Sequence, residues 1–127
     1  MDERQRILLV DADRDTLKLL NRTLETEGFD TVVVADGDAA LDLLDKIEPD
    51  LVILDTMTPG PDSFQVLDRL REHSDVPIIM LTTEYEVATL KTALSRGADD
   101  FIGKPFGTRS FVARIRAKLR RARQERV

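Results

Sequence analysis

Five short apolar runs alternate with longer amphipathic stretches along the chain. The runs cover residues 7–10, 31–34, 51–54, 78–81 and 101–102, and most are rich in branched side chains. Each is too short for a helix and predicts a β-strand. In the stretches between them apolar residues recur three or four positions apart, as at Leu17, Leu20 and Leu24, which predicts helices with one buried face.

Strict alternation of strand and helix predicts an α/β fold. Because the strands are apolar on both faces, we expect a five-stranded parallel sheet covered by helices on both sides, in the doubly wound arrangement that right-handed crossovers produce. Gly28 and Gly97 stand where helices should end in a left-handed turn. In such sheets, ligands bind at the carboxyl ends of the strands.

Length and composition fit one domain. The chain has 127 residues, no cysteine and no apolar run near the roughly 20 residues that span a bilayer. These features exclude disulfides and thiolate metal sites, and we expect a cytoplasmic protein.

The net charge of −5 is unevenly distributed. From Lys104 onward there are nine basic residues and one acidic residue, although acidic residues predominate before that point. We interpret residues 1–121 as the domain and 122–127 as a basic extension or the start of a linker. Basic residues are favoured near a helix C-terminus by the helix dipole, although nucleic-acid binding also fits them.

Chemically capable side chains follow the predicted strands. Asp11 ends the first strand, Asp13 comes two residues later, Asp55 ends the third, Thr82 ends the fourth and Lys104 follows the fifth. Carboxylates that meet on one edge need a cation, and hard oxygen ligands suit magnesium. A phosphoryl group fits such a cation, with Lys104 adding positive charge and Thr82 a hydrogen bond.

Each of these residues also has an ordinary explanation. Asp13 could be the N-cap of the next helix, Thr82 could satisfy backbone groups in a turn, and Lys104 could be a solvated lysine. Their joint occurrence at one edge favours a functional site.

Four motifs in order resemble those of response-regulator receiver domains, along the whole chain. ILLVDADRD resembles the acidic first-strand motif, DLVILDTMTPGPDSF the phosphoacceptor motif, PIIMLTT the switch-threonine strand and GADDFIGKPF the lysine-proline motif. The resemblance implies a flavodoxin-like sheet with strand order 2-1-3-4-5 and five helices. It also implies a two-component signalling role, with a histidine kinase as partner and no enzymatic turnover beyond self-phosphorylation and self-dephosphorylation.

The resemblance assigns roles residue by residue. Asp55 would be the nucleophile that becomes an aspartyl phosphate, with Mg²⁺ and Lys104 balancing charge. Mg²⁺ would be held by Asp55, the backbone carbonyl of Met57 and Asp11, with Asp13 as a further candidate.

Switching is also implied. Thr82 would move toward the phosphoryl group and Phe101 would swing inward, although a strand aromatic is usually a core residue. The Lys104–Pro105 peptide bond would be cis.

Three positions depart from the family pattern. Ala12 stands where receivers usually carry a second acid, Thr83 where they keep a small residue, and Ser63 where glycine is common. The missing acid at Ala12 predicts weakened Mg²⁺ binding, whereas Thr83 and Ser63 predict slower access to the site or an altered loop, and so less efficient phosphotransfer.

The C-terminal residues resemble the last helix and linker of winged-helix response regulators, so DNA would be reached only through an effector domain absent from this chain. That class often dimerises through helix 4, strand 5 and helix 5. Asp99, Asp100 and Arg114 are candidates for charge pairs across such an interface, but Leu90 and Ser110 replace an expected basic and an expected acidic residue.

Two other classes of function remain open. One is a receiver that has lost the chemistry and acts as a phosphorylation-independent interaction module. The other is a haloacid-dehalogenase-type phosphatase, in which Asp11 would be the nucleophile; this scheme leaves Asp55 unexplained and finds only Glu125 as an acidic metal ligand after Lys104.

Overall fold

The computed structural model describes residues 4–11, 13–56, 62–82 and 87–125. Strands and helices alternate through these residues. In chain order they are β1 (Arg6–Val10), α1 (Arg14–Thr26), β2 (Asp30–Val34), α2 (Gly37–Ile47), β3 (Leu51–Asp55), α3 (Ser63–His73), β4 (Ile78–Thr82), α4 (Val87–Ser95), β5 (Asp100–Gly103) and α5 (Thr108–Glu125). The predicted strand positions are confirmed, each within two residues at either end.

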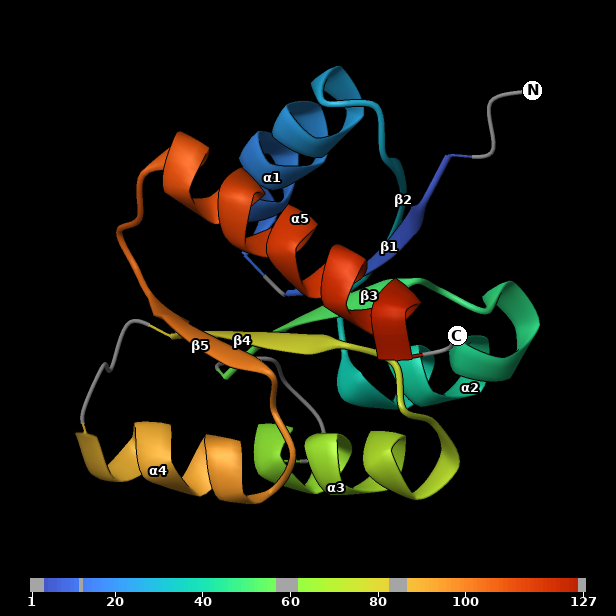
Figure 1. Cartoon of the computed structure of the whole chain (residues 1–127), viewed down its shortest axis with the longest axis vertical. Coiled ribbons are helices and arrows are strands. Elements are labelled where there is room, and N and C mark those ends of the chain that lie inside the picture. Colours follow the sequence, from blue (N-terminus) through green and yellow to red (C-terminus); the bar gives the residue numbers. More distant parts are fainter. Residues whose placement is uncertain (1–3, 12, 57–61, 83–86, 126–127) are drawn as a thin grey trace.

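The five strands form one parallel sheet in the order β2-β1-β3-β4-β5. Helices α1 and α5 cover one face, and α2, α3 and α4 cover the other (Figure 1). The predicted α/β fold and its strand order are confirmed. All five strands therefore point their carboxyl ends toward the same edge of the sheet.

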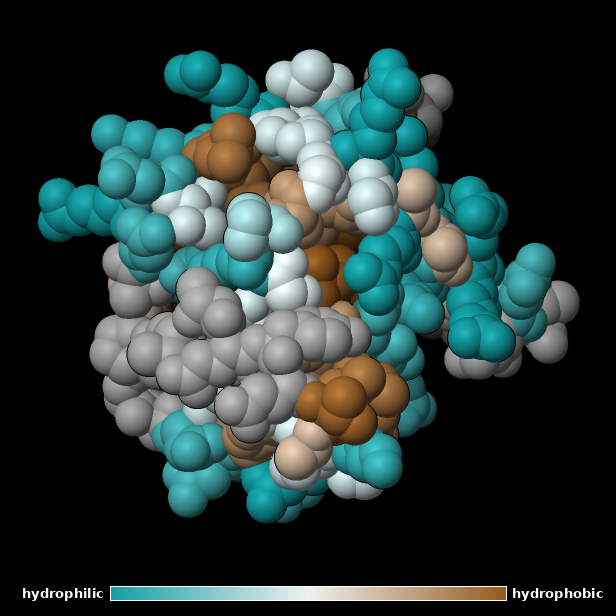
Figure 2. Space-filling view, turned by 90° about the vertical axis from the view of Figure 1, so that its left-hand side faces the viewer, coloured by the Kyte–Doolittle hydropathy of each residue, from teal (hydrophilic) through white to brown (hydrophobic). Residues whose placement is uncertain are grey.

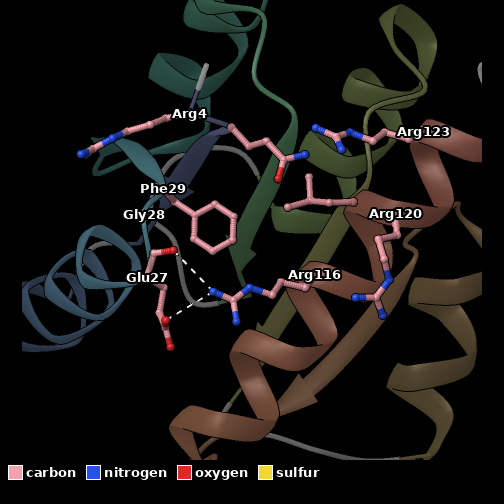
Figure 3. Close-up of a pocket in the computed structure, with 9 residues that line it drawn as sticks. Arg4, Glu27, Gly28, Phe29, Arg116, Arg120 and Arg123 are labelled. Atoms are coloured by element: carbon pink, nitrogen blue, oxygen red, sulfur yellow. Dashed lines mark hydrogen bonds and ion pairs between the residues drawn. The ribbon is translucent and has the colours of Figure 1, made fainter. Parts of the chain in front are cut away.

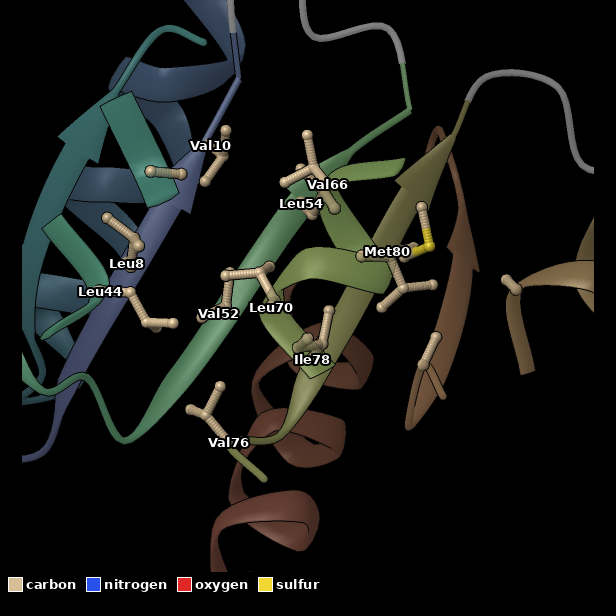
Figure 4. Close-up of a cluster of buried hydrophobic side chains, with 14 of the residues drawn as sticks. Leu8, Val10, Leu44, Val52, Leu54, Val66, Leu70, Val76, Ile78 and Met80 are labelled. Atoms are coloured by element: carbon tan, nitrogen blue, oxygen red, sulfur yellow. The ribbon is translucent and has the colours of Figure 1, made fainter. Parts of the chain in front are cut away.

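Alternate side chains of the strands enter two separate cores. On the face covered by α2–α4, Leu8, Val52 and Met80 pack with residues of these helices such as Leu70 (Figure 4). The other core contains Ile7 and its equivalents in neighbouring strands, packed against α1 and α5. Because both faces are buried, a register shift by one residue would exchange the two sets of strand side chains.

Local signals account for several helix ends. Asp13, Asp36 and Asp62 are N-caps whose carboxylates accept backbone N–H bonds of the first turn. Gly28 and Gly97 have φ of 92° and 105°, so the predicted left-handed turns after α1 and α4 are confirmed. Among the helices of the described residues, none combines the length and apolarity needed to cross a membrane.

Candidate functional site

The predicted site residues meet at the carboxyl edge of the sheet. Asp11 follows β1, and its backbone N–H donates to the carbonyl of Val34 at the end of β2, at 3.2 Å. Asp55 ends β3 beside β4, and the N–H of Lys104 donates to the carbonyl of Thr82 at 2.7 Å. Figure 2 views this edge, where hydrophilic surface surrounds a few separate apolar patches.

Lys104 joins two buried carboxylates. Its ammonium donates to Asp55 Oδ2 and lies 3.4 Å from Asp11 Oδ2. The side chains of Asp55, Asp11 and Lys104 are 2%, 6% and 16% exposed. One positive charge thus lies between two negative charges in a setting with little water, where charge interactions are strong.

The pKa directions reflect this setting. Burial raises the pKa of Asp11, and the neighbouring Asp55 charge adds to the effect, although the Asp13 N–H and Lys104 oppose it. Burial alone would lower the pKa of Lys104, but its contacts with Asp55 and Asp11 outweigh burial and raise it. Lys104 therefore stays charged at neutral pH.

Thr82 lies in a hydroxyl arrangement that sequence analysis did not anticipate. The Thr56 hydroxyl donates to the Thr82 hydroxyl at 2.9 Å, and the Ser63 hydroxyl donates to the Thr56 carbonyl at 3.3 Å. Thr82 and Ser63 are both buried. Ser63, a departure from the family pattern, thus ties the start of α3 to the end of β3. The only sequence signal for Thr56 was a hydroxyl residue directly after Asp55.

Asp13 is exposed and serves as the N-cap of α1. Its carboxylate accepts from the Asp15 N–H at 3.3 Å and from the Thr16 hydroxyl at 2.5 Å. The Thr16 bond is the main cause that lowers the pKa of Asp13. Both oxygens are engaged with the helix, so the ordinary explanation of Asp13 accounts for its position.

The donor set fits a hard cation in part. Asp11 and Asp55 present two buried carboxylates at one edge, and such oxygen ligands suit Mg²⁺. Among the described residues, no three His, Cys, Asp or Glu side chains gather in a possible metal cluster. Met57, whose carbonyl we expected as a ligand, lies outside the described residues, as do Ala12 and Thr83.

Phe101 is 1% exposed and belongs to the core shared with α2–α4. This position agrees with its core role, and its switching role stays a prediction. The Lys104–Pro105 peptide bond is cis.

The acidic residues expected at a dimer interface are engaged within the chain. Arg114 donates to both carboxylate oxygens of Asp100, at 2.9 and 2.7 Å. Asp99 accepts from Arg71 at 2.5 Å and from the Ile78 N–H at 2.8 Å. These contacts connect β5 to α5 and α3 within one molecule.

The chain is similar to known signalling proteins. The response regulator receiver domain family matches residues 7–116. A DNA-binding response regulator MtrA from Mycolicibacterium smegmatis is 46% identical over 122 residues, which are 96% of this chain and 54% of that protein. A probable transcriptional regulator ycf27 from Porphyridium aerugineum is 42% identical over 94% of this chain and 50% of that protein.

Among solved structures, the BeF3-activated N-terminal receiver domain of Klebsiella pneumoniae RstA is similar, with a TM-score of 0.88 and 33% identity over 91% of this chain and 99% of that one. The chain spans about half the length of the curated relatives named above. These comparisons favour neither the phosphatase nor the interaction-module alternative.

Proposed function

Because the chain belongs to the response regulator receiver domain family of two-component signalling, we propose that Asp55 is its phosphoacceptor and that a histidine kinase is the donor. The observation that carries this proposal is the contact of the buried Asp55 carboxylate with the Lys104 ammonium at the carboxyl edge of the sheet. Family membership makes the chain a signalling domain.

The proposed transfer uses side chains of this edge. An Asp55 carboxylate oxygen attacks the phosphorus of phosphohistidine, a P–O bond forms as the P–N bond breaks, and the imidazole leaves with the electron pair of that bond. Lys104 stays protonated and balances the negative charge on the transferring oxygens. The Thr82 hydroxyl then donates to a phosphoryl oxygen. With acetyl phosphate as the donor, the same attack by Asp55 breaks the P–O bond to the acetyl group, and acetate leaves.

Asp11 and Asp55 are the described residues that would hold Mg²⁺, with the Met57 carbonyl proposed as a third ligand. When bound, the ion supplies positive charge that neutralises the carboxylates and the phosphoryl oxygens. The chain has Ala12 at the position of a second acid, and the Asp13 carboxylate caps α1. We therefore propose weaker Mg²⁺ binding than two adjacent acids would give.

Phosphorylation is proposed to shift the α4–β5–α5 face between two conformations through Thr82 and Phe101. Since the chain spans about half of its curated relatives, DNA binding is proposed to belong to an effector domain outside residues 1–127. A homodimer through the α4–β5–α5 face and a cytoplasmic location stay predictions. For such a dimer, Asp100 and Arg114 would have to exchange their mutual contact for contacts across the interface.

The test is intact-mass spectrometry after incubation with acetyl phosphate, with and without Mg²⁺. We expect the wild type to gain one phosphoryl group in a Mg²⁺-dependent reaction, and Asp55→Asn to gain none. Asp62→Asn is the control, because Asp62 is an exposed N-cap carboxylate and should not affect the mass gain. If the wild type gains no phosphoryl group under any condition, the phosphorylation-independent module becomes the better explanation.

A further inference from the structure

A second concave site lies at the amino end of the sheet, away from Asp55. It is a cavity of about 440 Å³ between the residues that precede β1, the turn from α1 to β2, and the C-terminal half of α5 (Figure 3). Among the described residues, four arginines line it, namely Arg4, Arg116, Arg120 and Arg123, against one carboxylate, Glu27. Its volume lies within the range of small-ligand sites.

One arginine is held in place by the wall of the cavity. Arg116 Nη2 lies 3.3 Å from Glu27 Oε2 and 3.4 Å from the Glu27 carbonyl oxygen. The Arg116 guanidinium also lies 5.9 Å from the centre of the Phe29 ring, a cation–π distance. These contacts orient Arg116 toward Glu27, the one carboxylate that the described residues contribute to the cavity lining.

The other three arginines have no carboxylate partner among the described side chains. Arg123 points from α5 toward the cavity, whereas Arg4 and Arg120 are exposed at its rim with their guanidinium groups directed away from its centre (Figure 3). Arg116, Arg120 and Arg123 are four and three residues apart, so they share one face of α5. The cavity thus concentrates positive charge on a chain whose net charge is −5.

The helix dipole does not explain this arrangement fully. It favours basic residues near the end of α5. It does not account for Arg4, which comes from the other end of the chain, or for the hollow between the elements. A planar guanidinium presents paired N–H donors that match phosphate oxygens, and several arginines together match several phosphate groups.

We propose that this cavity binds a compact anion with several linked phosphoryl groups, such as an oligophosphate chain. The bound anion contacts Arg123 on α5, and the exposed side chains of Arg120 on α5 and Arg4 before β1 rotate to reach it. It thereby links the last helix to the amino end of the sheet. The site is independent of Asp55 and of the proposed phosphotransfer.

Calorimetry with sodium tripolyphosphate in Mg²⁺-free buffer of low ionic strength tests this site. We expect one saturable site, with weaker binding of inorganic phosphate. Arg120→Gln combined with Arg123→Gln should weaken binding about tenfold or more, because each removes a charged hydrogen-bond donor. Arg121→Gln is the matched control, since Arg121 lies on the same helix but faces a different cavity beside Asp75 and Pro77.

Amide NMR spectra locate the bound anion. Shifts of the Gly28 and Phe29 amides, absent from the double variant, support the proposed site. Three outcomes overturn it: no saturable binding, equal loss in the Arg121→Gln control, or shifts of these amides with a short DNA duplex but not with tripolyphosphate. An Asp55→Asn protein should bind tripolyphosphate as the wild type does, so this result does not depend on phosphorylation.

Discussion

The two ends of the parallel sheet handle charge in opposite ways. At the carboxyl end, Lys104 lies between the buried carboxylates of Asp11 and Asp55, and each charge contacts another. At the amino end, Arg4 and Arg120 are exposed and have no carboxylate partner among the described side chains. Because the charges at the carboxyl end are buried, the strength of their interactions depends on the distances between them. The interactions of the exposed arginines at the amino end depend on net charge and on salt concentration.

At the amino end, Arg71 resembles the carboxyl-end residues, because it is largely buried and fully engaged by partners. Arg71 is 21% exposed and binds the carbonyls of Gly97 at 2.7 Å and Val76 at 2.5 Å, in addition to the Asp99 carboxylate. It connects α3 to the segments that enter β4 and β5. Burial and pairing, rather than position at one end of the sheet, therefore distinguish the two kinds of charged residue. Substitutions at both ends can test this distinction.

The largest effect is expected from Lys104→Met. Removing the ammonium leaves two buried carboxylates facing each other, which should lower the free energy of unfolding by about 3 kcal/mol. Mg²⁺ should restore part of this loss, because a cation that binds the folded state stabilises it. Urea unfolding with EDTA or with Mg²⁺ measures both effects.

Lys91→Met is the matched control for this change. Lys91 is exposed on α4 and makes no ion pair with a described residue. Its loss should alter the free energy of unfolding by less than about 0.5 kcal/mol. Equal changes in the free energy of unfolding for the two substitutions would mean that Lys104 does not stabilise the buried carboxylates at the carboxyl end.

The second-largest effect is expected from Arg71→Met. The substitution keeps an apolar stem but removes the guanidinium that donates to the carbonyls of Gly97 and Val76. We expect the free energy of unfolding to fall by about 2 kcal/mol. Arg120→Gln at the same end of the sheet should change it by less than about 0.5 kcal/mol, because Arg120 is exposed and unpaired among the described side chains. If Arg120→Gln lowers the free energy of unfolding as much as Arg71→Met does, the distinction between buried, paired arginines and exposed, unpaired ones is wrong.

The sequence was sufficient for features that depend on neighbours along the chain. Branched apolar runs predicted the strands, and Gly28 and Gly97 marked helix ends, because backbone conformation there depends on local residue type. Because each of them follows a predicted parallel strand, Asp11, Asp55, Thr82 and Lys104 were expected to meet at one edge, as they do.

Features made by tertiary contacts could not be predicted in this way. Arg71 contacts residues that lie up to 28 positions away, and only the packing of α3 brings them together. Asp13 was a candidate for both an N-cap and a metal ligand, and the contact of its carboxylate with the Thr16 hydroxyl shows the capping role. The cavity beside Phe29 joins both ends of the chain, so no sequence window contains it.

A smaller effect at the carboxyl end is expected from Thr56→Val. The change keeps the shape of the side chain but removes the hydroxyl that donates to Thr82 at 2.9 Å. In the wild type the Thr82 oxygen accepts this bond, whereas the proposed contact with a phosphoryl oxygen uses the Thr82 hydroxyl proton. Losing one such neutral bond should slow phosphorylation by acetyl phosphate about threefold to tenfold.

Two further variants distinguish positioning of Thr82 from general damage to the fold. Thr56→Ser should restore the rate, and in a Thr82→Ala background Thr56→Val should have no further effect, because the two hydroxyls act together. Thr92→Val is a control, since the Thr92 hydroxyl donates to the Ala88 carbonyl within α4, away from Thr82. An equal slowing by Thr56→Val with and without Thr82 would show that Thr56 acts through another contact. Support for a precisely arranged site at the carboxyl end would then come from the contacts of Lys104 with Asp11 and Asp55, and not from the two hydroxyls.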